Sequence, residues 1–410
     1  MIATNPLSQS TARPSVSVAQ GRGPYANTRA ALESVDLSAV RGKGVLLKPN
    51  AGREALPGEG ITAHPEVVAA AIDVFREAGA EVAVGESPIT GVKTMDAFAA
   101  TGITEIARER DCPLIDMDRR QPVEMALDQG RALRSIKVCA DVMDHDLVVS
   151  IPVMKMHMHT GVTLAVKNMK GCLWRRSKVQ LHMLPPVEDS DQKPINIAIA
   201  DMASVLRPHL AIIDGTIGME GLGPSAGEPK ALDAVVVGVD AFAADAVACQ
   251  LMGTQAESVS HLAIGAERGY GVIDLATIAV TPEHWSDWVV PFAAPPANLS
   301  IEFPNVTVFD NNSCSACQST LLLFLQRYRD QLFDYLPTGA HLNIAIGGGH
   351  DELPAGTLCL GNCARNFTNE GKSVPGCPPV ASEILKALTG KPSIDRKDGQ
   401  SPGAGQRQGL

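Results

Sequence analysis

The sequence is poor in aromatic residues, which make up 4% of its 410 residues. Proteins that bind single-stranded nucleic acid usually stack the bases on aromatic rings, so this shortage argues against such a surface. The chain also lacks an excess of basic residues, because its formal net charge is −10. A general nucleic-acid binder has a basic electrostatic footprint. We therefore predict that the protein has no nucleic-acid partner.

No apolar stretch has the length of a membrane span, which takes about 20 consecutive apolar residues. The longest candidate, Ile195–Leu206, is shorter and contains Asp201. The first residues of the chain are polar and have no apolar core of the kind found in secretion signals. These observations predict a cytoplasmic protein without a membrane partner.

Two nucleotide-binding patterns are also missing, namely the P-loop and the dinucleotide fingerprint. The glycine-rich run 215–227 has the composition of a phosphate-binding loop but matches neither pattern. A mobile turn around Glu220 explains this run at least as well as a nucleotide site does.

What the sequence does contain is an alternation of strand-like and helical segments. The predicted strands are 15–19, 44–47, 81–84, 114–117, 142–151, 209–214 and 232–239, and the predicted helices are 24–35, 65–78, 95–110, 195–206 and 241–252. This alternation is typical of α/β units on a mostly parallel sheet with flanking helices. We predict one such domain over residues 15–282.

A second, smaller α/β unit is predicted after a proline-rich connector, over residues 305–390. Its predicted strands are 305–309 and 341–346, and its predicted helices are 319–332 and 380–388. This unit carries five of the nine cysteines.

The stretch 148–171 organises the first domain. It opens with a buried strand that Pro152 ends, because proline removes a ladder donor. Open α/β sheets place their ligands beyond the carboxyl ends of strands, and ammonium, hydroxyl and amide groups suit an anion. Such groups crowd this stretch: Lys155, His157, His159, Thr160, Thr163, Lys167, Asn168 and Lys170. A solvated basic loop is the alternative, but the alternating Met154, Met156 and Met158 indicate that one side is buried.

Polar residues at the ends of other predicted strands complete the candidate site. We predict His157 or His159 as the acid/base group, since histidine titrates near neutral pH. Lys155 and Glu86 are further catalytic candidates. The predicted substrate-binding residues are Lys48, Asn50, Lys167, Asn168, Lys170, Asp214 and Glu220.

Four cysteines of the second unit form a candidate metal site. Cys314 and Cys317 make a C-x-x-C motif between a predicted strand and helix, and Cys363 and Cys377 follow on two further loops. Four thiolates on three loops can enclose a cubane, and the Cys-Pro pair at 377–378 is similar to the ferredoxin pattern. We therefore predict a [4Fe-4S] cluster.

Two other interpretations of these cysteines stay open. Zinc also accepts four thiolates, although zinc sites usually come as two C-x-x-C pairs, whereas Cys359 and Cys363 are separated by three residues. A thioredoxin-like motif is the third interpretation, but it needs neither Cys363 nor Cys377. Cys359 is either a buried bystander or a replacement for one of the four ligands.

Several segments resemble the family catalogued as domain of unknown function 362 (DUF362). They are LKPN at 47–50, VGES at 84–87, IPVMKMH at 151–157, GVTLAVKNMKG at 161–171 and the DG…EG…GP pattern within 214–224. GNCA at 361–364 and PGCPP at 375–379 resemble the iron–sulfur-bearing tails of part of that family. Many members carry a repeated C-x-x-C-x-x-C insertion, and its absence here favours a single cluster. The domain is also distantly similar to nickel-dependent lactate racemases, but no convincing match to their cofactor histidines is present.

Together these features predict a [4Fe-4S] enzyme, with redox activity on an anionic small molecule and an electron-donor protein as a partner. Four cysteine ligands leave no open iron, so such a cluster transfers single electrons. In one alternative, one iron of the cluster has no cysteine ligand and acts as a Lewis acid in a lyase or isomerase reaction. Another is a non-catalytic electron carrier or sensor, against which the many lysine, histidine and asparagine residues of 148–171 argue.

Overall fold

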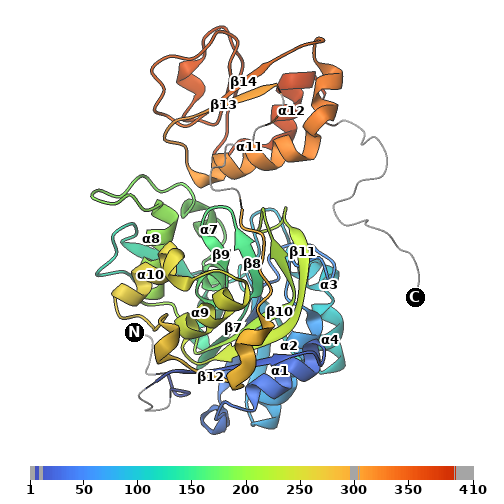
Figure 1. Ribbon diagram of the computed structural model, residues 1–410, viewed down its shortest axis with the longest axis vertical. Helices are drawn as coiled ribbons and strands as arrows, with labels where there is room; N and C mark the ends of the chain where they lie inside the picture. The colour runs from blue at the N-terminus through green and yellow to red at the C-terminus, as the bar shows by residue number, and fades with distance from the viewer. Residues whose placement is uncertain (1–4, 9–12, 296–302, 304, 392, 394–410) are drawn as a thin grey trace, which may run out of the picture. The chain divides into compact units, whose positions relative to one another are not determined.

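The computed structural model describes residues 5–8, 13–295, 303, 305–391 and 393. The chain divides into two compact units (Figure 1). The first unit comprises Met1–Leu181 and Pro186–Pro295, and the second comprises His182–Pro185 and Pro296–Leu410. Among the described residues, no helix combines the length and the apolar character that crossing a membrane requires.

The first unit is built on a mixed sheet, which has ten strands within the described residues. Its main path runs β12-β1-β11-β10-β7-β2-β3-β4. These strands are β1 (Ser15–Gln20), β2 (Gly44–Pro49), β3 (Glu81–Glu86), β4 (Leu114–Asp116), β7 (Leu147–Ile151), β10 (Leu210–Glu220), β11 (Glu228–Gly238) and β12 (Ala279–Thr281). Neighbours are parallel, except that β11 is antiparallel to β1 and β10. The predicted mostly parallel α/β sheet is confirmed.

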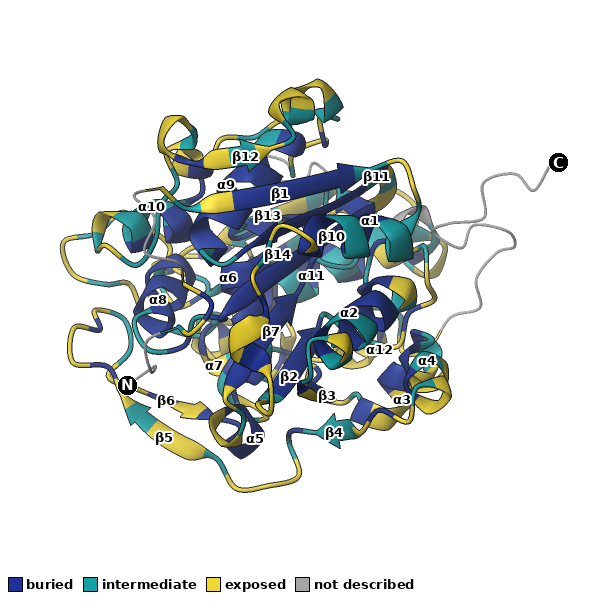
Figure 2. Ribbon diagram, turned by 90° about the horizontal axis from the view of Figure 1, so that it is seen from below, coloured by how far each residue is buried: buried dark blue, intermediate teal, exposed yellow. Residues whose placement is uncertain are grey.

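Helices cover both faces of this sheet (Figure 2). On one face lie α1 (Pro24–Leu32), α2 (Pro65–Glu77), α3 (Thr94–Ala100) and α4 (Ile103–Glu109), and on the other lie α6 (Ala165–Asn168), α8 (Pro194–Ala203) and α9 (Ala241–Leu251). A small hairpin, β5 (Val123–Ala126) and β6 (Ser135–Val138), forms a separate sheet.

Helix α2 shows how the sequence determines the core. Pro65 occupies the first turn, where a missing N–H costs nothing, and the ring of His64 accepts a hydrogen bond from the backbone N–H of Glu66. The apolar residues that recur at helical spacing are fully buried between helix and sheet: Val67, Val68, Ala71, Ile72 and Phe75.

Three predicted segments differ from the structure. The predicted helix 95–110 is two helices, because Gly102 between them adopts a left-handed φ of 77°. The predicted strand 142–151 is wrong at its start: α5 (Ala140–Asp144) occupies it, and β7 begins at Leu147 after a charged run. The glycine-rich run is also different, because Gly215–Glu220 belongs to β10 and only 221–227 forms a turn.

The glycines of β10 serve close packing of strands. A Cβ on Gly218 would lie 2.6 Å from the Met154 carbonyl oxygen, and one on Gly215 would lie 2.7 Å from the Met154 sulfur. Met154 belongs to β8 (Val153–His157), which pairs with β10. Glycine at these two positions therefore lets β8 approach β10.

The stretch 148–171 contains a β-hairpin over residues 153–163 and is not a loop. Pro152 separates β7 from β8, and β8 pairs antiparallel with β9 (Gly161–Thr163). All five residues of β8 are buried. The alternation of methionine with lysine and histidine in 154–158 is thus the two-residue period of a strand. Helix α6 and the 3-10 helix η2 (Met169–Cys172) follow.

The second unit contains a parallel sheet in the order β13-β14-β15-β16. Its strands are β13 (Val306–Asp310), β14 (Leu342–Ile346), β15 (Leu358–Leu360) and β16 (Ser373–Val374), and its longer helices are α11 (Ser315–Tyr328) and α12 (Ala381–Thr389). Leu321, Phe324 and Leu325 of α11 pack into the same core as Ile384 and Leu385 of α12. The unit is α/β, as predicted for its elements, and its iron–sulfur character stays a prediction.

Candidate functional site

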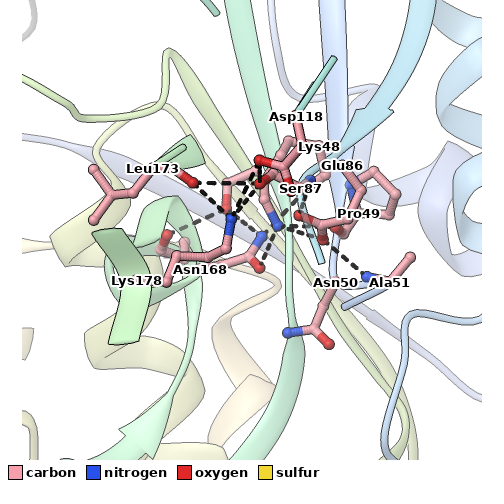
Figure 3. A network of polar contacts seen from close by, with 12 residues as sticks. Lys48, Pro49, Asn50, Ala51, Glu86, Ser87, Asp118, Asn168, Leu173 and Lys178 are labelled. Carbon is pink, nitrogen blue, oxygen red and sulfur yellow. Dashed lines mark hydrogen bonds and ion pairs between the residues drawn. The ribbon is translucent and has the colours of Figure 1, made fainter. Parts of the chain in front are cut away.

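A buried ion pair joins the carboxyl ends of β2 and β3 (Figure 3). The Lys48 Nζ atom lies 2.7 Å from Glu86 Oε2, and it also donates hydrogen bonds to the Pro49 carbonyl at 3.0 Å and to Asn168 Oδ1 at 3.0 Å. Three bonds use all three donors of an ammonium group. Lys48, which the sequence predicts as a substrate-binding residue, is therefore fully engaged within the protein.

The partners of this pair are equally engaged. The Glu86 carboxylate also accepts hydrogen bonds from the backbone N–H groups of Ala51 and Ser87, at 3.1 and 2.8 Å. The Asn168 amide donates to the Lys48 carbonyl and to Ser150 Oγ. A Cβ on Gly171 would lie 2.5 Å from Lys48 Nζ, so only glycine leaves room for the pair. The network thus connects the ends of β2, β3 and β7 to α6 and holds these elements in place around the site.

A second polar cluster beside it includes two residues that the sequence analysis missed. Lys178, in α7 (Ser177–Gln180), donates to the Leu173 carbonyl at 2.6 Å and contacts Ser87 Oγ. The Ser87 hydroxyl in turn donates to Asp118 at 2.6 Å. Burial lowers the pKa of Lys178. The position of Asp118, directly after a predicted strand, was the available signal for this cluster.

Lys155 has a different environment from Lys48. Its Nζ atom donates to the Ile61 carbonyl at 2.6 Å and to Asn50 Oδ1 at 3.3 Å, and it lies 3.5 Å from the Pro224 carbonyl. Among the described residues, none of its partners is a carboxylate. Burial lowers the pKa of Lys155 well below its ordinary value, and the neighbouring cations Lys167 and Arg53 lower it further.

Lys167 is a second buried ammonium group of this kind. Its Nζ atom contacts Thr163 Oγ1 at 3.1 Å, and burial lowers the pKa of Lys167 to about 7. Lys170, within η2, is half-buried, and burial together with Lys167 and Lys178 lowers its pKa well below the usual range. The structure thus brings together several of the predicted cations.

Asp245 of α9 holds the short helix that carries Lys167. Its two carboxylate oxygens accept the backbone N–H groups of Ala165 and Val166, at 2.7 and 3.0 Å, and so cap the start of α6. Burial raises the pKa of Asp245 to about 8. Sequence reasoning missed this residue, although an acid inside an otherwise apolar helix was a signal.

The two predicted acid/base histidines lie next to each other. Both are buried, and their ring centroids are 5.9 Å apart. The backbone N–H of His159 donates to Nδ1 of His157 at 3.1 Å, so this nitrogen carries no proton in the observed arrangement.

The predicted acids Asp214 and Glu220 contact other parts of the protein. Asp214 accepts the backbone N–H groups of His64 and Thr216 at 2.7 and 2.9 Å, and burial raises its pKa. Glu220 accepts the Ala293 N–H at 2.9 Å and lies 3.3 Å from the Lys230 ammonium. In the described part of the chain, neither carboxylate forms an ion pair with Lys155 or Lys167.

The four predicted metal-ligating cysteines follow the strands of the second unit's parallel sheet. Cys314 and Cys317 come after β13, Cys363 after β15 and Cys377 after β16. A hydrogen bond between Cys317 and Cys314 lowers the pKa of Cys314 to about 6 and raises that of Cys317, which the nearby Cys377 and Cys363 raise further. Four cysteine thiolates are the usual donor set of a [4Fe-4S] cluster, and the cluster here stays a prediction.

Within the described residues, no group of three or more His, Cys, Asp or Glu side chains is arranged to hold a metal ion. Cys359 lies inside β15, fully buried against Ala345, Leu353 and Ala364. Its thiol belongs to an apolar core.

A family model described as "Domain of unknown function (DUF362)" matches residues 45–250. The chain belongs to the DUF362 family. The family region contains Lys48, Glu86, Lys155 and Lys167 but ends before the cysteine-rich unit. Membership of an iron–sulfur-bearing subgroup therefore stays a prediction.

Two known proteins are similar to this DUF362 chain. A thylakoid-associated protein of Synechocystis sp. is 28% identical over 222 residues, which are 54% of this chain and 67% of that protein. The lactate racemase apoprotein from Thermoanaerobacterium thermosaccharolyticum aligns with a TM-score of 0.41 and 13% identity. That alignment covers 57% of this chain and 56% of the racemase chain.

Replacing Lys48 with methionine leaves the Glu86 carboxylate buried without its cation. Removing one partner of a buried ion pair costs about 3–5 kcal/mol, so we expect K48M to lose that much unfolding free energy in urea titrations. The double variant K48M/E86Q should recover part of the loss. K43M is the control, because the Lys43–Asp146 pair is exposed and contributes at most about 1 kcal/mol. Equal losses in K48M and K43M would contradict this interpretation.

Lys167 should make stability depend on pH. An unfolded chain keeps lysine protonated up to about pH 10.4, whereas folded Lys167 loses its proton near its pKa of about 7. Between these values the unfolded state binds more protons, so this group raises the unfolding free energy by roughly 1.4 kcal/mol per pH unit.

K167M should lack this contribution, which denaturant titrations of wild type and variant between about pH 7 and about pH 9 measure. Other groups that titrate in this range are common to both proteins. Parallel pH profiles of wild type and K167M would show that Lys167 keeps an ordinary pKa.

Proposed function

We propose that this protein is a [4Fe-4S] enzyme that carries out redox chemistry on an anionic small molecule bound beside Lys155 and Lys167. One observation carries the proposal: two buried ammonium groups have no carboxylate partner among the described residues. Burying an uncompensated charge is costly, and an anion bound between the two groups would offset that cost.

The surrounding residues supply the other requirements of a binding site. Asn50 orients Lys155 through the bond at 3.3 Å, and Thr163 does the same for Lys167 at 3.1 Å. The buried positions of both lysines keep water away and strengthen their attraction for an anion. Lys170, half-buried in the same segment, adds a third lysine.

His157 and His159 are the proposed groups for holding and moving a proton. Because Nδ1 of His157 accepts a hydrogen bond, its Nε2 atom is the position for a transferable proton. Glu86, the other catalytic candidate, we assign to the frame of the site, since it is saturated by Lys48 and two backbone N–H groups.

Cys314, Cys317, Cys363 and Cys377 are the proposed cluster ligands. The lowered pKa of Cys314 supports this, because the thiolate is the form that binds metal. A cubane with four cysteine ligands, when bound, supplies single electrons, which an electron-donor protein would deliver. The cytoplasmic location stays a prediction from the sequence.

Metal analysis tests the cluster. Anaerobically purified protein should contain about four iron and four sulfide per chain and give a reduced-cubane EPR signal with dithionite. We expect C314A/C377A to lose the iron and C359A to keep it, because Cys359 lies in an apolar core. Zinc without iron in the wild type, or unchanged iron in C314A/C377A, would refute the cluster assignment.

Calorimetric titration with orthophosphate and with succinate tests the anion site. A hydrogen bond to a charged group contributes about 1.5–3 kcal/mol, so K155M should bind at least about tenfold more weakly. K43M, an exposed lysine variant, should bind as the wild type does. If K155M keeps the wild-type affinity, the protein is better explained as an electron carrier without a substrate.

A further inference from the structure

His261 is a fully buried residue in the first turn of α10 (Ser260–Glu267). Among the described residues, neither of its ring nitrogens has a hydrogen-bond partner. Buried polar groups are nearly always hydrogen-bonded, and each one left unpaired costs about 1–3 kcal/mol. Two unpaired nitrogens on one ring therefore require an explanation.

Two other buried histidines among the described residues have a paired ring nitrogen. Nδ1 of His209 accepts the backbone N–H of Val148 at 3.0 Å, and Nε2 of His350 contacts the Ile346 carbonyl at 3.0 Å. The fold can thus satisfy a buried imidazole, and His261 differs from these two residues in that both of its ring nitrogens lack a partner.

The position of His261 links it to the anion site. The Thr160 backbone lies beside the ring but outside hydrogen-bonding geometry. Burial, together with the nearby Lys167 ammonium, lowers the pKa of His261 to about 3. Val259, two residues earlier, packs against the β8–β9 turn, since a Cβ on Gly161 would lie 3.6 Å from it.

We propose that His261 is a further binding residue of this site, whose neutral ring donates a hydrogen bond to the anion held by Lys167. The inference rests on the proposed function and extends it. A neutral imidazole offers one donor and one acceptor, so it adds direction to a site whose lysines supply charge. The His261 N–H would also make the site selective. An anion with an oxygen atom placed to accept this hydrogen bond would bind more tightly than an anion that only neutralises the lysine charges.

A space-filling role predicts the opposite energetics. If His261 only filled the core, its unpaired nitrogens would weaken the fold without benefit, and an apolar ring would serve better. When a group serves binding at the expense of stability, its removal stabilises the fold and weakens binding. Stability and binding should therefore change in opposite directions when the nitrogens are removed.

The test is thermal unfolding of wild type, H261F and H209F, without added anion and with saturating orthophosphate or succinate. H261F should unfold at the same or a higher temperature than the wild type in anion-free buffer. Its affinity for the responding anion should fall at least about tenfold, so that the anion-dependent rise in unfolding temperature is largely lost. H209F should unfold at a lower temperature, because it loses the bond to Val148.

Each outcome bears on a different claim. If the anion still raises the unfolding temperature of H261F as it does that of the wild type, the role of His261 is overturned and the proposed anion site remains in place. A lower anion-free unfolding temperature of H261F, like that of H209F, shows a structural role and also overturns the inference. If neither anion raises the unfolding temperature of the wild type, the anion site itself fails, and the inference fails with it.

Discussion

The buried ion pair between Lys48 and Glu86 is the interaction on which the rest of the site depends. It lies where β2 and β3 end, and its bonds reach Asn168 on α6 and, through Asn168, Ser150 on β7. Burying two charges is costly, and here their mutual attraction and the further hydrogen bonds of both groups offset that cost. The pair fixes the elements from which the neighbouring cations project, and it consumes the carboxylate that would otherwise neutralise one of them.

The other buried acids around the site are also occupied by partners within the protein. Asp245 accepts two backbone N–H groups at the start of α6, and Asp214 accepts two more, from His64 before α2 and from Thr216 within β10. Each acid is thus occupied by two backbone donors. Lys155 and Lys167 are consequently left with neutral oxygens, and burial lowers the pKa of both ammonium groups. This charge balance, more than the identity of any single residue, supports an anionic ligand.

In both units the candidate functional side chains lie at the carboxyl ends of parallel strands. In the first unit these ends carry the ion pair and the polar cluster around Lys178, and in the second they carry the four cysteines. A strand interior gives a different environment, as Cys359 shows: four residues before Cys363, it is sealed in the core. Position relative to the strand end thus separates candidate ligands from packing residues.

The sequence by itself determined the α/β class, the main strands and helices, and the crowding of polar groups at strand ends. These features follow from short-range periodicity and from breaks at glycine and proline, which each segment carries in its own residues. It did not reveal that 153–163 is a hairpin, because a strand with an alternating pattern becomes recognisable only beside its partners.

Only the tertiary structure decided which charges are paired. Lys48 and Lys155 look alike in the sequence, yet one is matched by Glu86 and the other is not. Asp245 and His261 lie on helices far along the chain, and nothing local links them to α6 or to the β8–β9 turn. Pairing and burial are long-range properties, set by which segments pack together.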